Sequence, residues 1–149
     1  MSYFALDPQS FLEPISVHIG SAAIGPGTFN LATTERIDIG KFEFVLVAVA
    51  DGGGSGTIDV TPEESDSQTG SLTPLDGTNG NPDFRISFAA SEFELKHKII
   101  RTAGRRQYLN FKVVIGTAAA RPCIILYGIR RIQASGPDIE ADLVPLQVA

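Results

Sequence analysis

The 149-residue chain contains no tryptophan, a single cysteine and only two histidines. One cysteine excludes an intrachain disulfide and a zinc site built from several cysteines. His18 and His97 are the only side chains whose ordinary pKa lies near neutrality, so general acid–base catalysis has few candidates. The sequence also lacks a Gly-x-Ser-x-Gly nucleophile elbow and a His-Glu-x-x-His zinc motif. We therefore expect no enzyme activity, no catalytic residues, no metal site and no cofactor.

Long apolar runs are missing as well. The longest, Phe44 to Ala50, has seven residues, whereas a membrane-spanning helix needs about 20. The first residues have neither a basic start nor a long apolar stretch, so they do not resemble a signal peptide. We expect a protein that is made in the cytoplasm and does not enter a membrane.

Short runs in which apolar and polar residues alternate make up most of the chain, and this period of two is typical of β-strands. Glycine-rich turns at residues 50–56 and 103–106 separate neighbouring runs, and Pro62 is expected to end one of them. Residues 65–82 are expected to form a long exposed loop. The expected strands cover residues 15–19, 28–39, 42–49, 57–61, 84–88, 93–99, 109–115 and 123–132. This number and spacing predict an all-β fold, a two-sheet antiparallel sandwich or jelly roll.

The alternation also predicts which side chains face the core. We expect Cys123 to be a small buried residue, His97 to point inward and His18 to point outward. The expected inner face includes Phe44, Leu46, Ile58, Ile86, Leu95, Phe111, Val113 and Ile125.

Both ends of the chain lack a strand pattern. We divide the chain into an N-terminal arm (1–14), a β-sandwich domain (15–133) and a C-terminal arm (134–149). Apolar residues in the C-terminal arm are too frequent for a solvated tail, so we expect another surface to cover them. These residues are Ile139, Leu143, Val144, Leu146 and Val148.

Charge is distributed unevenly along the chain. Residues 1–95 contain 3 basic and 14 acidic residues, residues 96–131 contain 9 basic and no acidic residues, and residues 132–149 contain 3 acidic and no basic residues. A nucleic-acid site would use such a basic strip, but the chain is acidic overall and places few aromatic residues nearby. Contact with an acidic protein surface is therefore favoured over nucleic acid.

Two polar segments could suggest ligand sites. The glycine turn at residues 51–56 lacks the lysine and the following helix of a phosphate-binding P-loop, so a hairpin turn is favoured. Glu63, Glu64 and Asp66 could offer oxygen ligands to calcium, but they lack the spacing of an EF-hand, and a solvated acidic loop is favoured.

Several segments in order resemble small virion proteins of tailed bacteriophages, over roughly residues 42–133. The first is the strand 45–49 with its glycine turn, followed by Gly56-Thr57-Ile58-Asp59-Val60-Thr61-Pro62-Glu63-Glu64-Ser65-Asp66 and the segment from Ser67 to Leu75. The next is Ile99-Ile100-Arg101-Thr102-Ala103-Gly104-Arg105-Arg106-Gln107-Tyr108-Leu109, and the last is the basic end Gly128-Ile129-Arg130-Arg131. The chain departs from the pattern at Gln107 and in the additional strand pair between Phe84 and Ile99.

The resemblance implies a capsid decoration (cement) protein with a jelly-roll fold, bound to the major capsid protein on the surface of a phage head. A dimer or trimer is expected. Alternatives are another virion component, such as a head–tail connector or tail protein, and a non-viral ligand-binding β-sandwich. The residues expected to bind partners are Arg101, Arg105, Arg106, Arg130, Arg131, Phe4, Leu6, Phe11, Leu12, Leu143, Val144 and Leu146.

Overall fold

A computed structural model describes residues 12–19 and 22–130 of the chain. Most of these residues lie in strands, and the one helical element among them is the short 3-10 turn η3 (Thr33–Glu35). The strands are β1 (Leu12–Ile19), β2 (Gly27–Asn30), β3 (Ile37–Asp38), β4 (Phe42–Gly54), β5 (Thr57–Ser65), β6 (Thr73–Pro74), β7 (Ile86–Phe88), β8 (Leu95–Arg101), β9 (Tyr108–Gly116) and β10 (Ala120–Arg130).

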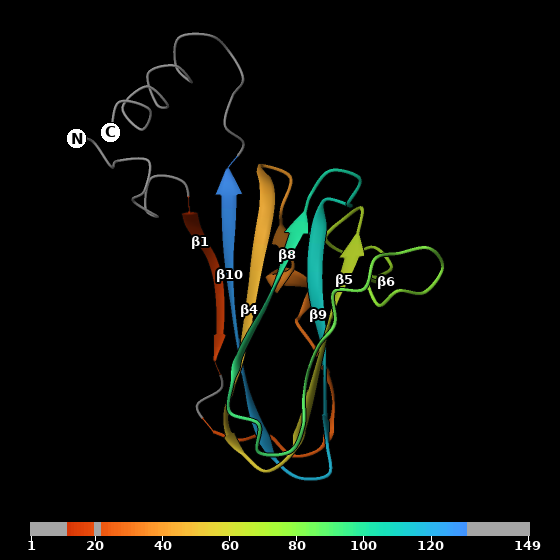
Figure 1. The fold of residues 1–149 in the computed structure, drawn as a ribbon. Coiled ribbons are helices and arrows are strands. Elements are labelled where there is room, and N and C mark those ends of the chain that lie inside the picture. Colours follow the sequence, from red (N-terminus) through yellow and green to blue (C-terminus); the bar gives the residue numbers. More distant parts are fainter. Residues whose placement is uncertain (1–11, 20–21, 131–149) are drawn as a thin grey trace, which may run out of the picture.

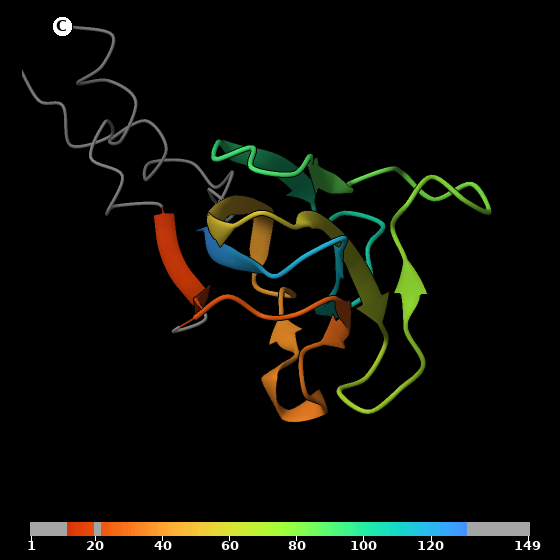
Figure 2. The ribbon, with the colours of Figure 1, turned by 90° about the horizontal axis from the view of Figure 1, so that it is seen from below.

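The strands form two antiparallel sheets that pack face to face (Figures 1 and 2). The four-stranded sheet has the order β1-β10-β4-β8, and the six-stranded sheet has the order β2-β9-β5-β6, with β3 paired to β9 and β7 paired to β5. Most connections pass from one sheet to the other, which gives the strand order of a jelly roll. The predicted two-sheet antiparallel β-sandwich is therefore confirmed.

The core lies between the two sheets. Alternate residues of β4 and β10 supply one side of it, including Val45, Val47 and Leu126, which are fully buried. The six-stranded sheet supplies the other side through Ile58 and Phe111, also fully buried. β-branched and aromatic side chains suit such a pleated, buried surface. Four of the residues expected inside are buried: Ile58, Ile86, Phe111 and Val113.

Pro62 does not end its strand, contrary to expectation. β5 continues through it to Ser65, and Pro62 is paired with Phe111 of β9. In an antiparallel strand the N–H and C=O of one residue point to the same side. The Pro62 carbonyl accepts the Leu75 N–H, so its missing N–H faces the edge of the sheet, between β6 and β7. No hydrogen bond to β9 is lost, which is the condition under which a strand tolerates proline.

The segment expected to be a long exposed loop is partly structured. It contains β6, and Leu75 beside it is fully buried in the core. The weak strand expected over residues 28–39 divides into β2, η3 and β3. Within the described residues, no helix is long and apolar enough to cross a membrane.

Candidate protein-binding face

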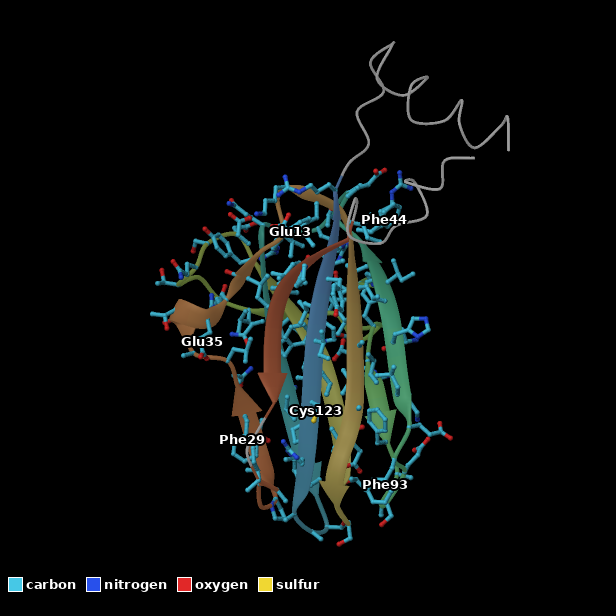
Figure 3. The ribbon with its side chains drawn as sticks, turned by 90° about the vertical axis from the view of Figure 1, so that its left-hand side faces the viewer. Glu13, Phe29, Glu35, Phe44, Phe93 and Cys123 are labelled. Atoms are coloured by element: carbon cyan, nitrogen blue, oxygen red, sulfur yellow. The ribbon has the colours of Figure 1, made fainter. Side chains whose placement is uncertain are left out.

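The outward side of the four-stranded sheet is apolar. Because Val45, Val47 and Val49 point into the core, the alternate residues Phe44 and Leu46 of β4 point away from it and are half-buried. β10 alternates in the same way: Ile124 and Leu126 are buried, and Ile125 and Tyr127 point outward and are half-buried. Figure 3 looks onto this side, with β1, β10, β4 and β8 next to one another.

Strand register places these outward residues in rows across the sheet. Leu46 lies between Tyr127 and Ile99, and Phe44 lies between Ile129 and Arg101. We define the outer face as the outward residues of β10, β4 and β8. They are Cys123, Ile125, Tyr127 and Ile129 of β10, Phe44, Leu46, Ala48 and Ala50 of β4, and Leu95, His97, Ile99 and Arg101 of β8.

Exposure of the outer face is greatest along β8. Leu95 is 68% exposed and Ile99 is 53% exposed, and Phe93, just before the strand, is 60% exposed. The solvent side of an antiparallel sheet ordinarily carries polar residues. A continuous apolar side with large exposed aliphatic residues is instead typical of a surface that binds another protein.

The outer face corrects part of the predicted core. Phe44, Leu46, Leu95 and Ile125 were expected to point inward, and all four lie on the outer face. The reason is that β4 and β10 are apolar on both sides, so the alternation identifies two faces without saying which of them is buried. Valine occupies the inner side of β4, where Val45, Val47 and Val49 are fully buried.

His97 is also misplaced by the sequence prediction, because it is exposed on the outer face. The predicted alternation is present in Phe93, Leu95, His97 and Ile99, but these residues point outward. The residue of this edge strand that is buried in the core is Ile100. Lys96, on the inward side, extends over the Phe88 ring at 4.8 Å and donates to the Ser87 carbonyl, 2.7 Å away. Lys96 thereby connects β8 to β7 of the other sheet. The adjacent apolar residues Ile99 and Ile100 were the signal that could have revealed this orientation.

Cys123 is half-buried on the outer face rather than buried in the core. The side chain of His18 lies outside the described residues. The predicted glycine turn is shorter in the structure, because β4 continues to Gly54 and only Ser55 and Gly56 connect it to β5. The N–H groups of these two residues donate to the Ala119 carbonyl.

Four of the five described arginines of the basic strip lie at one end of the sandwich, while Arg121 lies near the start of β10, at the other end. Arg101 ends β8 beside Phe44, and Arg130 ends β10 beside Phe42, while Arg105 and Arg106 follow in the turn from β8 to β9. Figure 1 shows that β8 and β10 end at the same pole. The structure therefore brings these four predicted partner-binding residues together, next to one end of the outer face.

Three of these arginines bind carboxylates of their own domain. Arg105 Nη1 lies 3.2 Å from Glu64 Oε1, and Arg106 Nη1 lies 3.6 Å from Asp66 Oδ2. Arg130 Nε donates to Glu13 Oε2 at 2.7 Å, and this contact, with a second from Lys41, lowers the pKa of the Glu13 carboxyl. Arg101 has no ion pair with the described residues, which leaves it the most available of the four for a partner.

The acidic segment is not a solvated loop, contrary to expectation. Glu63 and Glu64 are buried residues of β5, and only Asp66 is exposed. Glu64 shares a face with Val60 and closes one end of the core, where the Arg106 N–H donates to it at 2.9 Å. Glu63 accepts from Asn30 Nδ2 at 2.7 Å, and its burial raises the pKa of the carboxyl. In the described part of the chain, no group of three or more possible ligands could hold a metal ion.

The remaining predicted partner-binding residues cannot be placed on the face. Leu12 begins β1, opposite Ile129, but its side chain is not described. The others, Phe4, Leu6, Phe11, Arg131, Leu143, Val144 and Leu146, lie outside the described residues.

Comparison with known proteins gives no family for this chain. No protein-family model matches the sequence, and no curated protein matches it significantly.

Proposed function

We propose that the chain is a non-enzymatic structural subunit that binds other protein subunits through its outer face. The observation that carries this proposal is the exposure of Leu95 and Ile99 within a continuous apolar sheet surface. Burying such a surface contributes about 25 cal/mol per Å² of apolar area. Arg101 at the end of the face would add a charge-assisted contact to a carboxylate and help to fix the orientation of the partner.

The resemblance to small virion proteins of tailed bacteriophages supports one kind of assembly. We propose that the chain is a capsid decoration protein that binds the major capsid protein on the outside of a phage head and stabilises the shell. Such a protein needs a rigid body and an adhesive surface, and it needs no catalytic residues. Attachment of each copy to several neighbouring shell subunits would make binding multivalent.

The size of the outer face limits what it can do alone. Three strands about 4.8 Å apart, each followed over seven residues that rise about 3.4 Å, cover roughly 340 Å². A standard stable interface uses about 800 Å² on each partner. The proposal therefore requires a second contact, which the expected arms or a second copy in a dimer or trimer would supply.

The test is to mix the purified protein with undecorated, expanded heads of the encoding phage. Bound copies per head and the temperature at which the heads disrupt are both measured. We expect stoichiometric binding and a higher disruption temperature. Ile99→Lys should reduce binding by at least tenfold, because it places a charge on the most exposed strand of the apolar surface.

The matched control is Phe29→Lys, which changes another exposed apolar residue, on β2 of the other sheet. This variant should bind like the parent. Equal losses for both variants would show that the outer face is not the contact surface. Absence of binding to heads, combined with binding to purified tails or connectors, would assign the protein to another part of the virion.

A further inference from the structure

β8 has an unpaired edge. It is the last strand of the four-stranded sheet, and within the described residues β4 is its only hydrogen-bonded partner. The unpaired edge is bordered by the two most exposed aliphatic side chains of the outer face, Leu95 and Ile99. An exposed strand edge next to apolar residues is a surface to which another strand can be added.

A second copy of β8 is a poor partner for this edge. The strand carries Lys96, Lys98 and Arg101 and no acidic residue. Antiparallel pairing of two such strands would place positive side chains opposite or diagonal to each other, which is destabilising. The edge instead suits a strand that has acidic residues on one side and apolar residues on the other.

Residues 138–144 of the same chain have this pattern. Asp138, Glu140 and Asp142 alternate with Ile139, Ala141 and Leu143, and prolines at positions 137 and 145 bound the segment. The segment is as long as β8, which has seven residues. A strand bounded by prolines fits an edge position, because proline cannot extend a ladder.

We propose that residues 138–144 add to the edge of β8 as an antiparallel strand. One register pairs acidic with basic residues on one side of the strand and apolar with apolar residues on the other. In this register Glu140 lies opposite Lys98 and Asp142 lies opposite Lys96. Ile139 and Leu143 then lie opposite Ile99 and Leu95 and extend the outer face by one strand. Lys98 makes no ion pair with the described residues, so Glu140 gives it a partner.

The length and direction of the connecting chain allow this pairing within one molecule. β8 and β10 are both antiparallel to β4, so a chain that leaves β10 at Arg130 and turns back runs antiparallel to β8. Three strand spacings of about 4.8 Å separate β10 from a new strand beyond β8, or roughly 14 Å. Residues 131–137 can span about 23 Å when extended.

The proposal does not rest on the protein being a capsid component, and it can be tested on the isolated full-length chain. Hydrogen exchange of the β8 amides that point away from β4 is measured in the parent and in Ala141→Pro. Proline in the middle of the segment prevents pairing, so these amides should exchange at least tenfold faster in the variant. Ala134→Pro, outside the segment, is the control and should leave their exchange unchanged.

Disulfide trapping tests the register and the source of the strand. In a Cys123→Ser background, His97→Cys and Ala141→Cys lie directly opposite each other and should form a disulfide within the monomer upon oxidation. The pair His97→Cys and Glu140→Cys points to opposite faces and should not. Disulfide-linked dimers would overturn pairing within one chain, and absence of both the disulfide and the exchange effect would overturn strand addition altogether.

Discussion

The Phe42 ring occupies the space beside Gly128 where any other residue would place its Cβ. A Cβ built on Gly128 would lie 2.3 Å from Cδ1 and Cε1 of that ring, and Phe42 is itself 3% exposed. We therefore expect Gly128→Ala to destabilise the domain by about 1–3 kcal/mol, as overpacked core positions do. Urea unfolding measures the change. Gly25→Ala is the control, because no atom lies within 4 Å of the added Cβ, and its effect should stay within about 0.5 kcal/mol.

Phe111 provides a test of which side chains form the core. It is fully buried in β9, so Phe111→Ala should cost about 3–5 kcal/mol through lost burial and the cavity left behind. Phe93→Ala removes a ring that is 60% exposed and should change the free energy of unfolding by less than about 1 kcal/mol. Comparable losses at both positions would contradict the assignment of the two rings to the core and the surface.

The Glu64–Arg105 pair should contribute far more to stability than the neighbouring Asp66–Arg106 pair. The Glu64 side chain is 5% exposed and accepts from both the Arg105 guanidinium and the Arg106 N–H, whereas Asp66 is 81% exposed. Glu64→Ala leaves both donors without an acceptor and should cost about 3 kcal/mol. Asp66→Ala removes a surface ion pair and should cost less than about 1 kcal/mol. Thermal and urea unfolding of the two variants would expose a reversed order.

Glu63 should make stability fall as the pH rises from acid to neutral. Burial raises the pKa of this carboxyl above its ordinary value, so the folded state holds the proton more tightly than the unfolded state. Its contribution is fully present below the unfolded pKa and is lost as the pH rises through the folded pKa. Glu63→Gln keeps an acceptor for Asn30 and removes the charge. It should therefore stabilise the protein relative to the parent at pH 7 and have little effect at pH 3.

Glu13 supplies a control of opposite sign. Hydrogen bonds from Arg130 and Lys41 lower the pKa of this carboxyl, so its stabilising contribution is present at neutral pH and is lost as the pH falls. Glu13→Gln should therefore destabilise the protein at pH 7 and not at pH 3. Unfolding midpoints measured across this pH range would refute the assignment if the two variants followed the same trend.

The strands were predictable from local patterns, because turns and alternation are encoded in short stretches of sequence. The alternating run of β9 corresponds to a strand at nearly the expected bounds. The valine-rich run of β4 begins where expected but continues to Gly54 instead of ending at Val49. Leu75 was missed because a single apolar residue in a Ser- and Gly-rich segment has no period. Its burial depends on a contact with β5, where the Leu75 N–H donates to the Pro62 carbonyl, and short stretches of sequence do not encode such a contact.

The candidate binding face could not be assigned from sequence for a related reason. In β4 and β10 both sides are apolar, and only the packing of the second sheet decides that Val47 is inside and Leu46 outside. The basic strip is divided by the fold, with Arg101, Arg105, Arg106 and Arg130 at one end of the sandwich and Arg121 at the start of β10. The buried carboxylate that binds Arg105 was not foreseen, because Pro62 was taken as the end of the strand that positions Glu64.

The pairing of β1 with β10 has a consequence for synthesis on the ribosome. β1 is the first described strand to emerge and β10 is the last, and within the described residues β10 is the only strand that pairs with β1. The four-stranded sheet therefore cannot close until Arg130 has left the exit tunnel, and until then one edge of β4 stays unpaired. Nascent chains stalled before β10 should bind chaperones, and release of the complete chain should be followed by a single late folding step.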